Sequence, residues 1–455
     1  MAGIGFRLKA LVVKGSYLEA TTAYLSSAVI STGPWLSGVV ALIVLDSTTA
    51  TYLNQDDRSL LLATVIAVFA ASLFMAGGPQ MLLTRYLADR VYANDNASIA
   101  PTCTGVLFLN VPLALLTAPF LFFAPFTLSY RLLTVTLFLT LTMTWLITVF
   151  LSAARNFKRI VLIYGLSYAC GSGASLLLGQ FAGLTGSLAG FLFGQILCLS
   201  LLLGCVYHEF PSAQSVSWAY LRYLSKYWDL LLIGTLYTLG TLIDSFLFWM
   251  SPHGVTIHGF YHLFPPYDTA RFIVYLSTIP AAAIFMIHLE THFYRHYSAF
   301  YRFIRTKGTL SDLVRARQGM VAAVRAGVWT LLKVQGIIAL FLCVAARDLA
   351  TFLGLAPHWA MLVRVEAFAG LGQFMLFTMM LFLLYLDQRR SVLLIAALFL
   401  FSNAALTLAS LYLGELFYGM GYLIAGWLGA ILGWFLLNAH FKQLEYQTFM
   451  TQPLG

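Results

Sequence analysis

Charged residues are scarce in this chain of 455 residues. They make up 9% of it, against about 25% in a typical soluble domain, while 60% of its residues are hydrophobic. Soluble packing cannot hide so much apolar surface, so lipid must be the main solvent. Only helices or closed barrels satisfy all their backbone groups in lipid. The apolar runs are continuous rather than alternating, which predicts helices.

Cysteine is also rare, and the five cysteines form no recognisable framework. Their number is odd, all lie in or beside apolar runs, and no pair has the spacing of metal ligands. Disulfides and a zinc site are therefore not expected. The sequence also lacks the Gly-x-x-x-x-Gly-Lys-Ser/Thr phosphate loop and any catalytic constellation. We expect a protein that is not an enzyme and that uses no cofactor or metal.

The long apolar runs predict an all-α polytopic membrane protein with about twelve transmembrane helices, because one crossing takes about 20 apolar residues. The predicted spans are 17–45, 59–80, 101–124, 130–153, 159–181 and 184–207, followed by 227–250, 268–290, 326–346, 358–386, 391–413 and 418–440. Six spans in each half favour two bundles of the same orientation.

The expected domains follow these spans. They are a cytoplasmic amphipathic segment (1–16), a first six-helix bundle (17–207), a linker (208–226), a second six-helix bundle (227–441) and a cytoplasmic C-terminal tail (442–455). A basic linker at 292–325, expected to be helical, interrupts the second bundle. With both termini in the cytoplasm, most of the 26 basic residues fall on the cytoplasmic side, as the positive-inside rule requires.

Charged residues within the apolar spans are candidates for a transport pathway. A charge at the membrane centre costs about 2.5–3.5 kcal/mol, so it usually faces a cavity or a partner. Asp244 and Glu366 lie in the outer halves of their predicted spans, and Arg364 precedes Glu366 by two residues. These side chains either line a pathway or form structural ion pairs between helices, with Arg364 as a neutralising partner of Glu366.

Asp268 offers a third carboxylate, directly after Pro265, Pro266 and Tyr267. At the start of a predicted span, it is placed as an N-cap that accepts hydrogen bonds from free backbone N–H groups. Arg271, three residues later, is then expected to pair with it on one helix face. A pathway role for Asp268 is the alternative.

Aromatic residues make up 15% of the chain, and several lie near these charges. Tyr237, Phe246, Trp249, Tyr261 and Tyr267 are candidates for platforms on which sugar rings stack. The alternative is that they form interfacial belts and fill apolar helices.

Glycine and proline mark places where helices meet or bend. Gly186 and Gly190 form a Gly-x-x-x-Gly pattern, which predicts close contact between spans of this chain. Gly77-Gly78-Pro79 and Pro280 interrupt apolar runs. Such breakers free backbone groups that line cavities or act as hinges.

Several motifs extend this description. They are MAGIGF, SYLEA and ISTGPW near the N-terminus, D-S-F-x-F-W-x-S-P-x-G at 244–254, PPYD at 265–268 and YLSTIP at 275–280. On these motifs the chain resembles the PelG family, the inner-membrane exporter of the Pel exopolysaccharide of biofilms. That family is similar to the flippase superfamily that handles drugs, lipid-linked oligosaccharides and polysaccharides. Arg7 departs from the pattern, which has an acidic residue after GIGF.

The resemblance implies two six-helix bundles around a central cavity. It also implies export of a growing polymer of partly deacetylated, hence cationic, amino sugars, for which carboxylates such as Asp244 are suitable path linings. The implied partners are a cytosolic glycosyltransferase (PelF) and the membrane subunits PelD and PelE, with no nucleic acid. The basic linker is the expected docking surface, through Arg295, Arg302, Arg305, Lys307, Arg315 and Arg317.

Two other functions stay open. One is an ion-coupled antiporter or flippase for small molecules or lipid-linked oligosaccharides, with Asp244 or Glu366 as its coupling site. The other is a scaffold that assembles a synthase complex and forms no pore.

Overall fold

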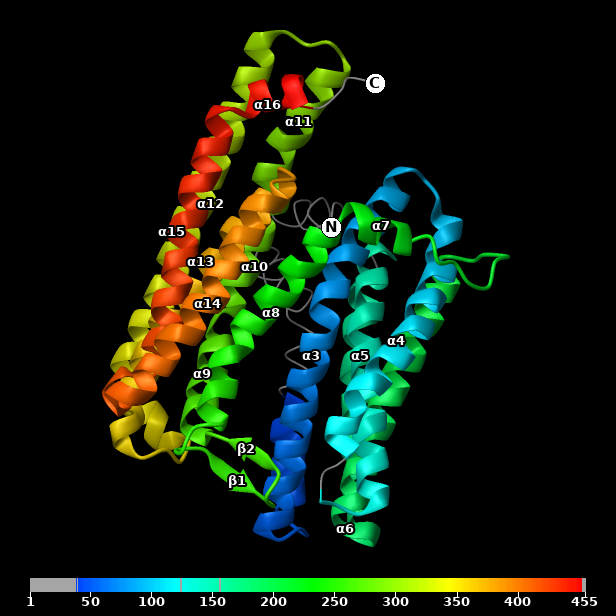
Figure 1. Ribbon diagram of the computed structural model, residues 1–455, viewed down its shortest axis with the longest axis vertical. Coiled ribbons are helices and arrows are strands. Elements are labelled where there is room, and N and C mark those ends of the chain that lie inside the picture. Colours follow the sequence, from blue (N-terminus) through cyan, green and yellow to red (C-terminus); the bar gives the residue numbers. More distant parts are fainter. Residues whose placement is uncertain (1–37, 39, 123–124, 155–156, 452–455) are drawn as a thin grey trace, which may run out of the picture. The chain divides into compact units, whose positions relative to one another are not determined.

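The computed structural model describes residues 38, 40–122, 125–154 and 157–451. These residues form two compact units, an N-terminal unit that ends at Pro265 and a C-terminal unit that begins at Pro266. Each unit consists of long helices that run side by side (Figure 1). The amphipathic segment predicted at 1–16 and most of the first predicted span, 17–45, lie outside the described residues.

The N-terminal unit begins with a short apolar helix, Val40–Thr49. It continues with α3 (Gln55–Tyr92), η1 (Asn96–Ser98), α4 (Ile99–Phe122), α5 (Leu128–Ala154), α6 (Phe157–Glu209), α7 (Leu221–Lys226) and α8 (Trp228–Trp249). Helix α3 packs against α5 and α8, and α5 also packs against α4 and α6. Helix α8, which the sequence assigns to the second bundle, thus belongs to the N-terminal compact unit. The division into two six-helix bundles stays a prediction.

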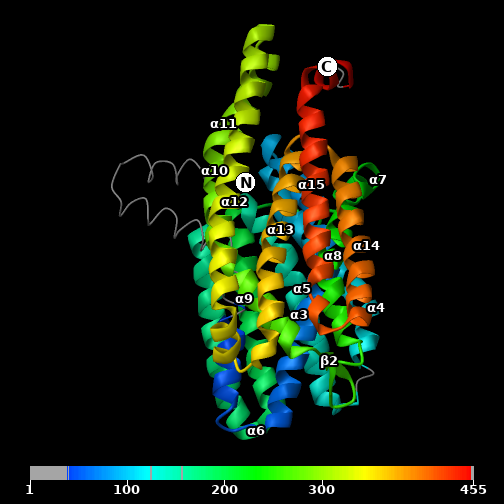
Figure 2. The same cartoon turned by 90° about the vertical axis from the view of Figure 1, so that its left-hand side faces the viewer.

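The C-terminal unit holds the remaining helices. They are α9 (Pro265–Ser277), α10 (Ile279–His288), the π-helical η2 (Leu289–Phe293), α11 (Tyr294–Arg305), α12 (Leu310–Phe352), η3 (Pro357–Trp359), α13 (Ala360–Tyr385), α14 (Arg389–Leu413), η4 (Glu415–Phe417), α15 (Met420–Lys442) and α16 (Leu444–Thr451). Helix α13 packs against α12 and α15, and α15 packs against α14. Figure 2 shows α12, α13 and α15 side by side, with α13 in the middle.

One small sheet interrupts the helices. Strands β1 (Val255–Ile257) and β2 (Tyr261–Leu263) pair antiparallel, with Thr256 opposite His262. Three residues connect the strands, since Ile257 pairs with Tyr261. The N–H of Phe260 donates to the carbonyl oxygen of Ile257 at 3.2 Å, and the two residues inside this turn, His258 and Gly259, have positive φ of 48° and 68°, as in a type I′ turn. The sequence pattern predicts only a loop here, because three-residue strands are too short to show an alternation.

Ten described helices are long and apolar enough to cross a membrane, which confirms an all-α polytopic membrane protein. Helix α6, with 53 residues, contains two of the predicted spans, because it reverses at Gly183 (φ 59°, ψ −137°). Only glycine adopts this backbone conformation readily. Together with the first span, most of which lies outside the described residues, these crossings agree with the predicted total of about twelve.

Glycines allow the two arms of α6 to touch. A Cβ on Gly171 would lie 2.9 Å from the Cα of Gly194, and Gly186 and Gly190 face the backbone of Leu178 and Ser175. Because glycine has no side chain, the backbones of the two arms approach closely. They then make dispersion contacts with each other in place of contacts with lipid. The contact predicted from the Gly-x-x-x-Gly pattern is confirmed.

Gly77 and Gly78 have a packing role as well. Helix α3 runs unbroken through Pro79, so this point is not a helix end. A Cβ on Gly78 would lie 2.9 Å from the carbonyl oxygen of Leu231, and Gly77 and Gly234 face each other across the α3–α8 contact. These glycines therefore bring α3 and α8 together.

The span predicted at 268–290 is part of a longer segmented helix. Helix α9 ends at Ser277 and α10 starts at Ile279 with Pro280 in its first turn, which confirms a break at this proline. The basic linker predicted at 292–325 is helical, since it comprises the end of η2, all of α11 and the start of α12. Thr309 begins α12 with a capping box, in which Thr309 and Asp312 each accept from the other's backbone N–H.

Candidate functional site

A buried ion pair lies in the C-terminal unit, between α9 and α13. The Nε of Arg271 is 3.9 Å from Oε2 of Glu366. Arg271 is only 4% exposed and Glu366 is fully buried. Because each charge would be costly to bury alone, the pair offsets part of the desolvation of both groups.

Three tyrosines surround the guanidinium group of Arg271. Its Nη1 donates to the hydroxyl of Tyr267 at 3.0 Å, and its Nη2 donates to the hydroxyl of Tyr275 at 2.8 Å. The ring of Tyr422, on α15, lies against the guanidinium with its centroid 3.8 Å from Cζ. This is the range of a strong cation–π contact, which is worth about 2 kcal/mol or more when both groups are desolvated.

The cluster forms where three helices begin. Tyr267 is in the first turn of α9, Glu366 in the second turn of α13 and Tyr422 in the first turn of α15. Gly419, just before α15, has φ of 84°, and a Cβ there would lie 2.9 Å from Oε1 of Glu366. A side chain at position 419 would thus be strained and would also displace the carboxylate.

Two predictions around this cluster are wrong. Arg364 is not the partner of Glu366, since its side chain is exposed and its Nε donates to the carbonyl oxygen of Cys343 at 3.2 Å. Residues two apart on a helix point in different directions, which explains the divergence. Asp268 is not an N-cap, because α9 starts three residues earlier, at Pro265. It lies half-buried within the first turn.

The other predicted site residues lie in the N-terminal unit, on α8. Asp244 is fully buried and Trp249 is 7% exposed, while Tyr237 is half-buried. The sequence correctly places charged and aromatic side chains on this helix. Their predicted contact with a substrate stays a prediction.

Trp249 lines an aromatic pocket at the end of α8. The pocket has a volume of about 370 Å³ and is formed by α3, α5, α8 and the β1–β2 hairpin. Its aromatic lining consists of Phe74, Phe138, Phe246, Trp249, Phe260, Tyr261 and His262. Burial raises the pKa of the Tyr261 phenol above its ordinary value, so this ring stays neutral at physiological pH. Three of the five aromatic residues proposed as sugar platforms, Phe246, Trp249 and Tyr261, therefore meet at one pocket.

Sequence reasoning missed Tyr275 and Tyr422 as members of the charged cluster. Tyr275 had a visible signal, since Tyr267, Arg271 and Tyr275 are spaced four residues apart and share one helix face. Tyr422 had none, because it lies far from Arg271 along the chain and only the packing of α15 brings it near.

The cluster holds two opposite charges in a fixed geometry inside a membrane-spanning unit. Intramembrane ionisable residues usually mark an ion or substrate pathway, or a structural pair between helices. The neutralised Arg271–Glu366 pair ties α9 to α13. Asp244 is a fully buried carboxylate on α8, the helix that also carries Trp249 and Phe246.

Solved structures with the same fold are membrane transporters. An outward-facing multidrug resistance MATE family transporter of the MOP superfamily has a TM-score of 0.66 at 14% identity, with 93% of this chain and 96% of that chain covered. A MATE protein in its bent conformation has a TM-score of 0.67 at 11% identity, covering 99% and 100%. A MOP superfamily transporter from Pyrococcus furiosus has a TM-score of 0.64 at 13% identity, covering 92% and 96%. The chain thus has the fold of a MOP superfamily transporter.

The sequence defines the family within this fold. The model of the PelG family, described as "Putative exopolysaccharide Exporter (EPS-E)", matches residues 1–449. The chain therefore belongs to the PelG family, and it is a multi-pass membrane transport protein. A comparison with curated protein sequences finds no significant match.

Proposed function

We propose that this chain carries a growing Pel-type exopolysaccharide across the bacterial cytoplasmic membrane, together with a cytosolic glycosyltransferase. The observation that carries the proposal is the match of an exopolysaccharide exporter family to residues 1–449, on a chain with a transporter fold. In this arrangement both termini lie in the cytoplasm. Elongation of the polymer by the glycosyltransferase supplies the force that moves it.

The chemistry of α8 supports a polymer of partly deacetylated amino sugars. Such a polymer is cationic and presents flat sugar faces. The carboxylate of Asp244 attracts the ammonium groups, and the aromatic pocket around Trp249 and Phe246 offers rings on which sugars stack. The other residues that we propose to line the path are Tyr237, Asp268 and Tyr267. Glu366 belongs to the proposed path as well, through its ion pair with Arg271.

Polymer secretion tests this function. In a strain that lacks its own copy, the wild-type chain restores polymer in the medium, measured as amino sugar released by acid hydrolysis. Asp244→Asn is expected to lower secretion at least about tenfold, the effect of losing roughly 1.4 kcal/mol of attraction, at an unchanged membrane level of the protein. Asp229→Asn, a half-buried carboxylate in the first turn of the same helix, is the matched control. Normal secretion by Asp244→Asn would exclude Asp244 from the path.

The exposed side of the α11–α12 hairpin is the proposed docking surface for the glycosyltransferase PelF. Exposed basic side chains there are Arg295, Arg302, Arg305, Lys307 and Arg315. Arg317 is engaged elsewhere, since its Nε lies 3.0 Å from Oε1 of Glu445 on α16. The membrane subunits PelD and PelE complete the proposed complex.

Charge reversal tests the docking surface. The triple variant Arg302→Glu, Arg305→Glu, Lys307→Glu is expected to lose co-purification with the glycosyltransferase. Arg390→Glu, an exposed arginine at the start of α14, is expected to retain it. Equal recovery of the glycosyltransferase from both variants would refute docking on this hairpin.

Ion-coupled exchange of a small molecule or lipid-linked oligosaccharide is the second candidate. It is supported by one observation, the likeness to solved multidrug resistance transporters. Here the buried Glu366 would be the coupling group. Drug-dependent proton efflux from liposomes that contain the purified chain, abolished by Glu366→Gln, would favour this candidate over polymer export.

A scaffold without a pore is the remaining alternative. In that case, polymer secretion would be unaffected by every variant of a proposed path residue.

A further inference from the structure

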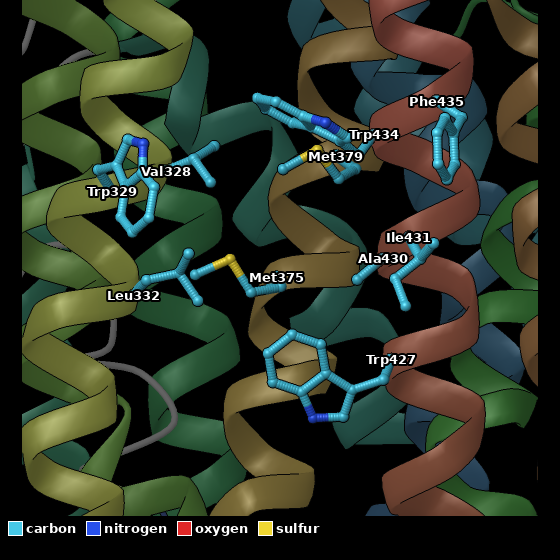
Figure 3. Close-up of a pocket in the computed structure, with 10 residues that line it drawn as sticks. All are labelled: Val328, Trp329, Leu332, Met375, Met379, Trp427, Ala430, Ile431, Trp434 and Phe435. Carbon is cyan, nitrogen blue, oxygen red and sulfur yellow. The ribbon is translucent and has the colours of Figure 1, made fainter.

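A groove runs along the outside of the C-terminal unit, between α12 and α15. Its middle section has a volume of about 350 Å³ and is lined entirely by apolar and aromatic side chains (Figure 3). The lining residues are Val328, Trp329, Leu332, Met375, Met379, Trp427, Ala430, Ile431, Trp434 and Phe435. Helix α13 forms the floor. Figure 3 shows Trp427 and Trp434 extending from α15 across α13, with Met375 and Met379 between the walls.

A cationic groove continues between the same two helices. It has a volume of about 370 Å³ and is lined by Arg317, Gln318, Val321, Ala322, Arg325, Asn438, Phe441 and Lys442. Arg325 precedes Trp329 by four residues on α12, and Asn438 follows Trp434 by four residues on α15. Residues four apart lie on the same helix face, so the cationic section lies directly above the aromatic one.

The charges of the upper section are available to a ligand. Arg325 and Lys442 are exposed, and neither has an ion-pair partner within the described part of the chain. Arg317 pairs with Glu445 at 3.0 Å and its Nη1 donates to the carbonyl oxygen of Phe441 at 3.2 Å. The carboxylate of Glu445 is thus neutralised by Arg317, and the charges of Arg325 and Lys442 leave a net positive site.

The depth of the groove matches one leaflet of a bilayer. Arg325 and Lys442 flank the spans predicted at 326–346 and 418–440, so they lie at the membrane surface. From Lys442 to Trp427 the helix rises by about 22 Å, and to Trp434 by about 12 Å. The apolar section therefore begins below the headgroups and extends for about 10 Å along the helix, against roughly 15 Å for one hydrocarbon leaflet.

We propose that this groove binds an anionic phospholipid of the bilayer. The headgroup phosphate lies between Arg325 and Lys442, and one acyl chain runs down the aromatic section past Trp434 and Trp329. Charge complementarity selects an anionic headgroup, since basic sites between transmembrane helices at the cytoplasmic surface bind such headgroups. The apolar section favours a lipid over a soluble phosphate, because only a lipid has an acyl chain to fill it. This site is separate from the proposed polymer path.

Native mass spectrometry of the full-length protein in detergent tests the site. The probes are phosphatidylglycerol and phosphatidylcholine with the same acyl chains. The wild type is expected to bind phosphatidylglycerol more tightly. The double variant Arg325→Gln, Lys442→Gln is expected to lose about 10- to 30-fold in affinity for it, as two interfacial charges predict. Arg315→Gln, an exposed arginine on the same helix outside the groove, is expected to bind like the wild type.

The apolar section has its own variant. Trp329→Leu is expected to weaken binding of both lipids, whereas Phe341→Leu, also exposed on α12, leaves it unchanged. Glycerophosphoglycerol, the headgroup without chains, is expected not to compete at equal concentration. Three results would each overturn the proposal: equal affinity for the two lipids, an equal loss in Arg315→Gln, or full competition by the free headgroup.

Discussion

Two helix contacts, one in each unit, bring membrane-spanning segments together by opposite means. In the N-terminal unit, α3 and α8 meet where side chains are missing, at Gly77, Gly78 and Gly234. In the C-terminal unit, α9 and α13 meet through charged side chains, Arg271 and Glu366. The first contact depends on shape and the second on charge. Each should therefore be sensitive to a different kind of substitution.

Added bulk at the α3–α8 contact is expected to have the largest effect. Gly234→Leu places a side chain against the backbone of Gly77, which cannot move without shifting the whole of α3. We expect loss of the monodisperse peak in size-exclusion chromatography of the detergent-solubilised protein. Gly204→Leu is the control, because a Cβ at Gly204, on α6, meets no atom within 4 Å. Similar behaviour of the two variants would show that α3 and α8 do not depend on this close approach.

Removal of one charge at the α9–α13 contact is expected to have the next largest effect. Arg271→Gln or Glu366→Gln leaves the other charge buried without its ion-pair partner, which costs about 3–5 kcal/mol. The double variant removes both charges and is expected to recover much of that loss. Thermal unfolding in detergent measures the three variants, with Arg364→Gln as an exposed control on α13. Additive losses in the double variant would show that the two side chains are not coupled.

Loss of a single hydrogen bond at the same contact is expected to have the smallest effect. Tyr275→Phe keeps the ring but removes the hydroxyl that accepts from Nη2 of Arg271 at 2.8 Å. A hydrogen bond to a charged group is worth about 1.5–3 kcal/mol, so a modest decrease in unfolding temperature should follow. Tyr412→Phe, at a side chain that is 91% exposed, serves as the reference. A loss as large as that of Glu366→Gln would place the main stabilisation in the tyrosine rather than in the ion pair.

The sequence predicted the helices well because apolar length is a local property. The predicted spans 130–153 and 391–413 lie within two residues of the ends of α5 and α14. The close helix contact at Gly186 and Gly190 and the helix break at Pro280 were also predicted from local sequence, since each depends on a few neighbouring residues. The β1–β2 hairpin was missed because its strands are too short for a pattern.

The ion pair could not be predicted in the same way. Arg271 and Glu366 are far apart along the chain, and nothing near either residue identifies the other. Local reasoning instead paired each with a close neighbour, Asp268 or Arg364. For Arg364 this failed because side chains two residues apart leave a helix on different sides. A charged residue within a predicted span indicates that it faces a partner or a cavity. Only the packing of the helices shows which residue that partner is.

The reversal of α6 at Gly183 has a consequence for how the chain enters the membrane. The two arms are joined by one residue in a glycine-only conformation and have no connecting loop. Neither arm can be positioned while the other is still outside the bilayer, because their glycine faces lie against each other. The insertion machinery should therefore release the two arms of α6, residues 157–209, into the bilayer together as a helix pair. An epitope tag placed at this turn would be expected to disrupt biogenesis rather than report on topology.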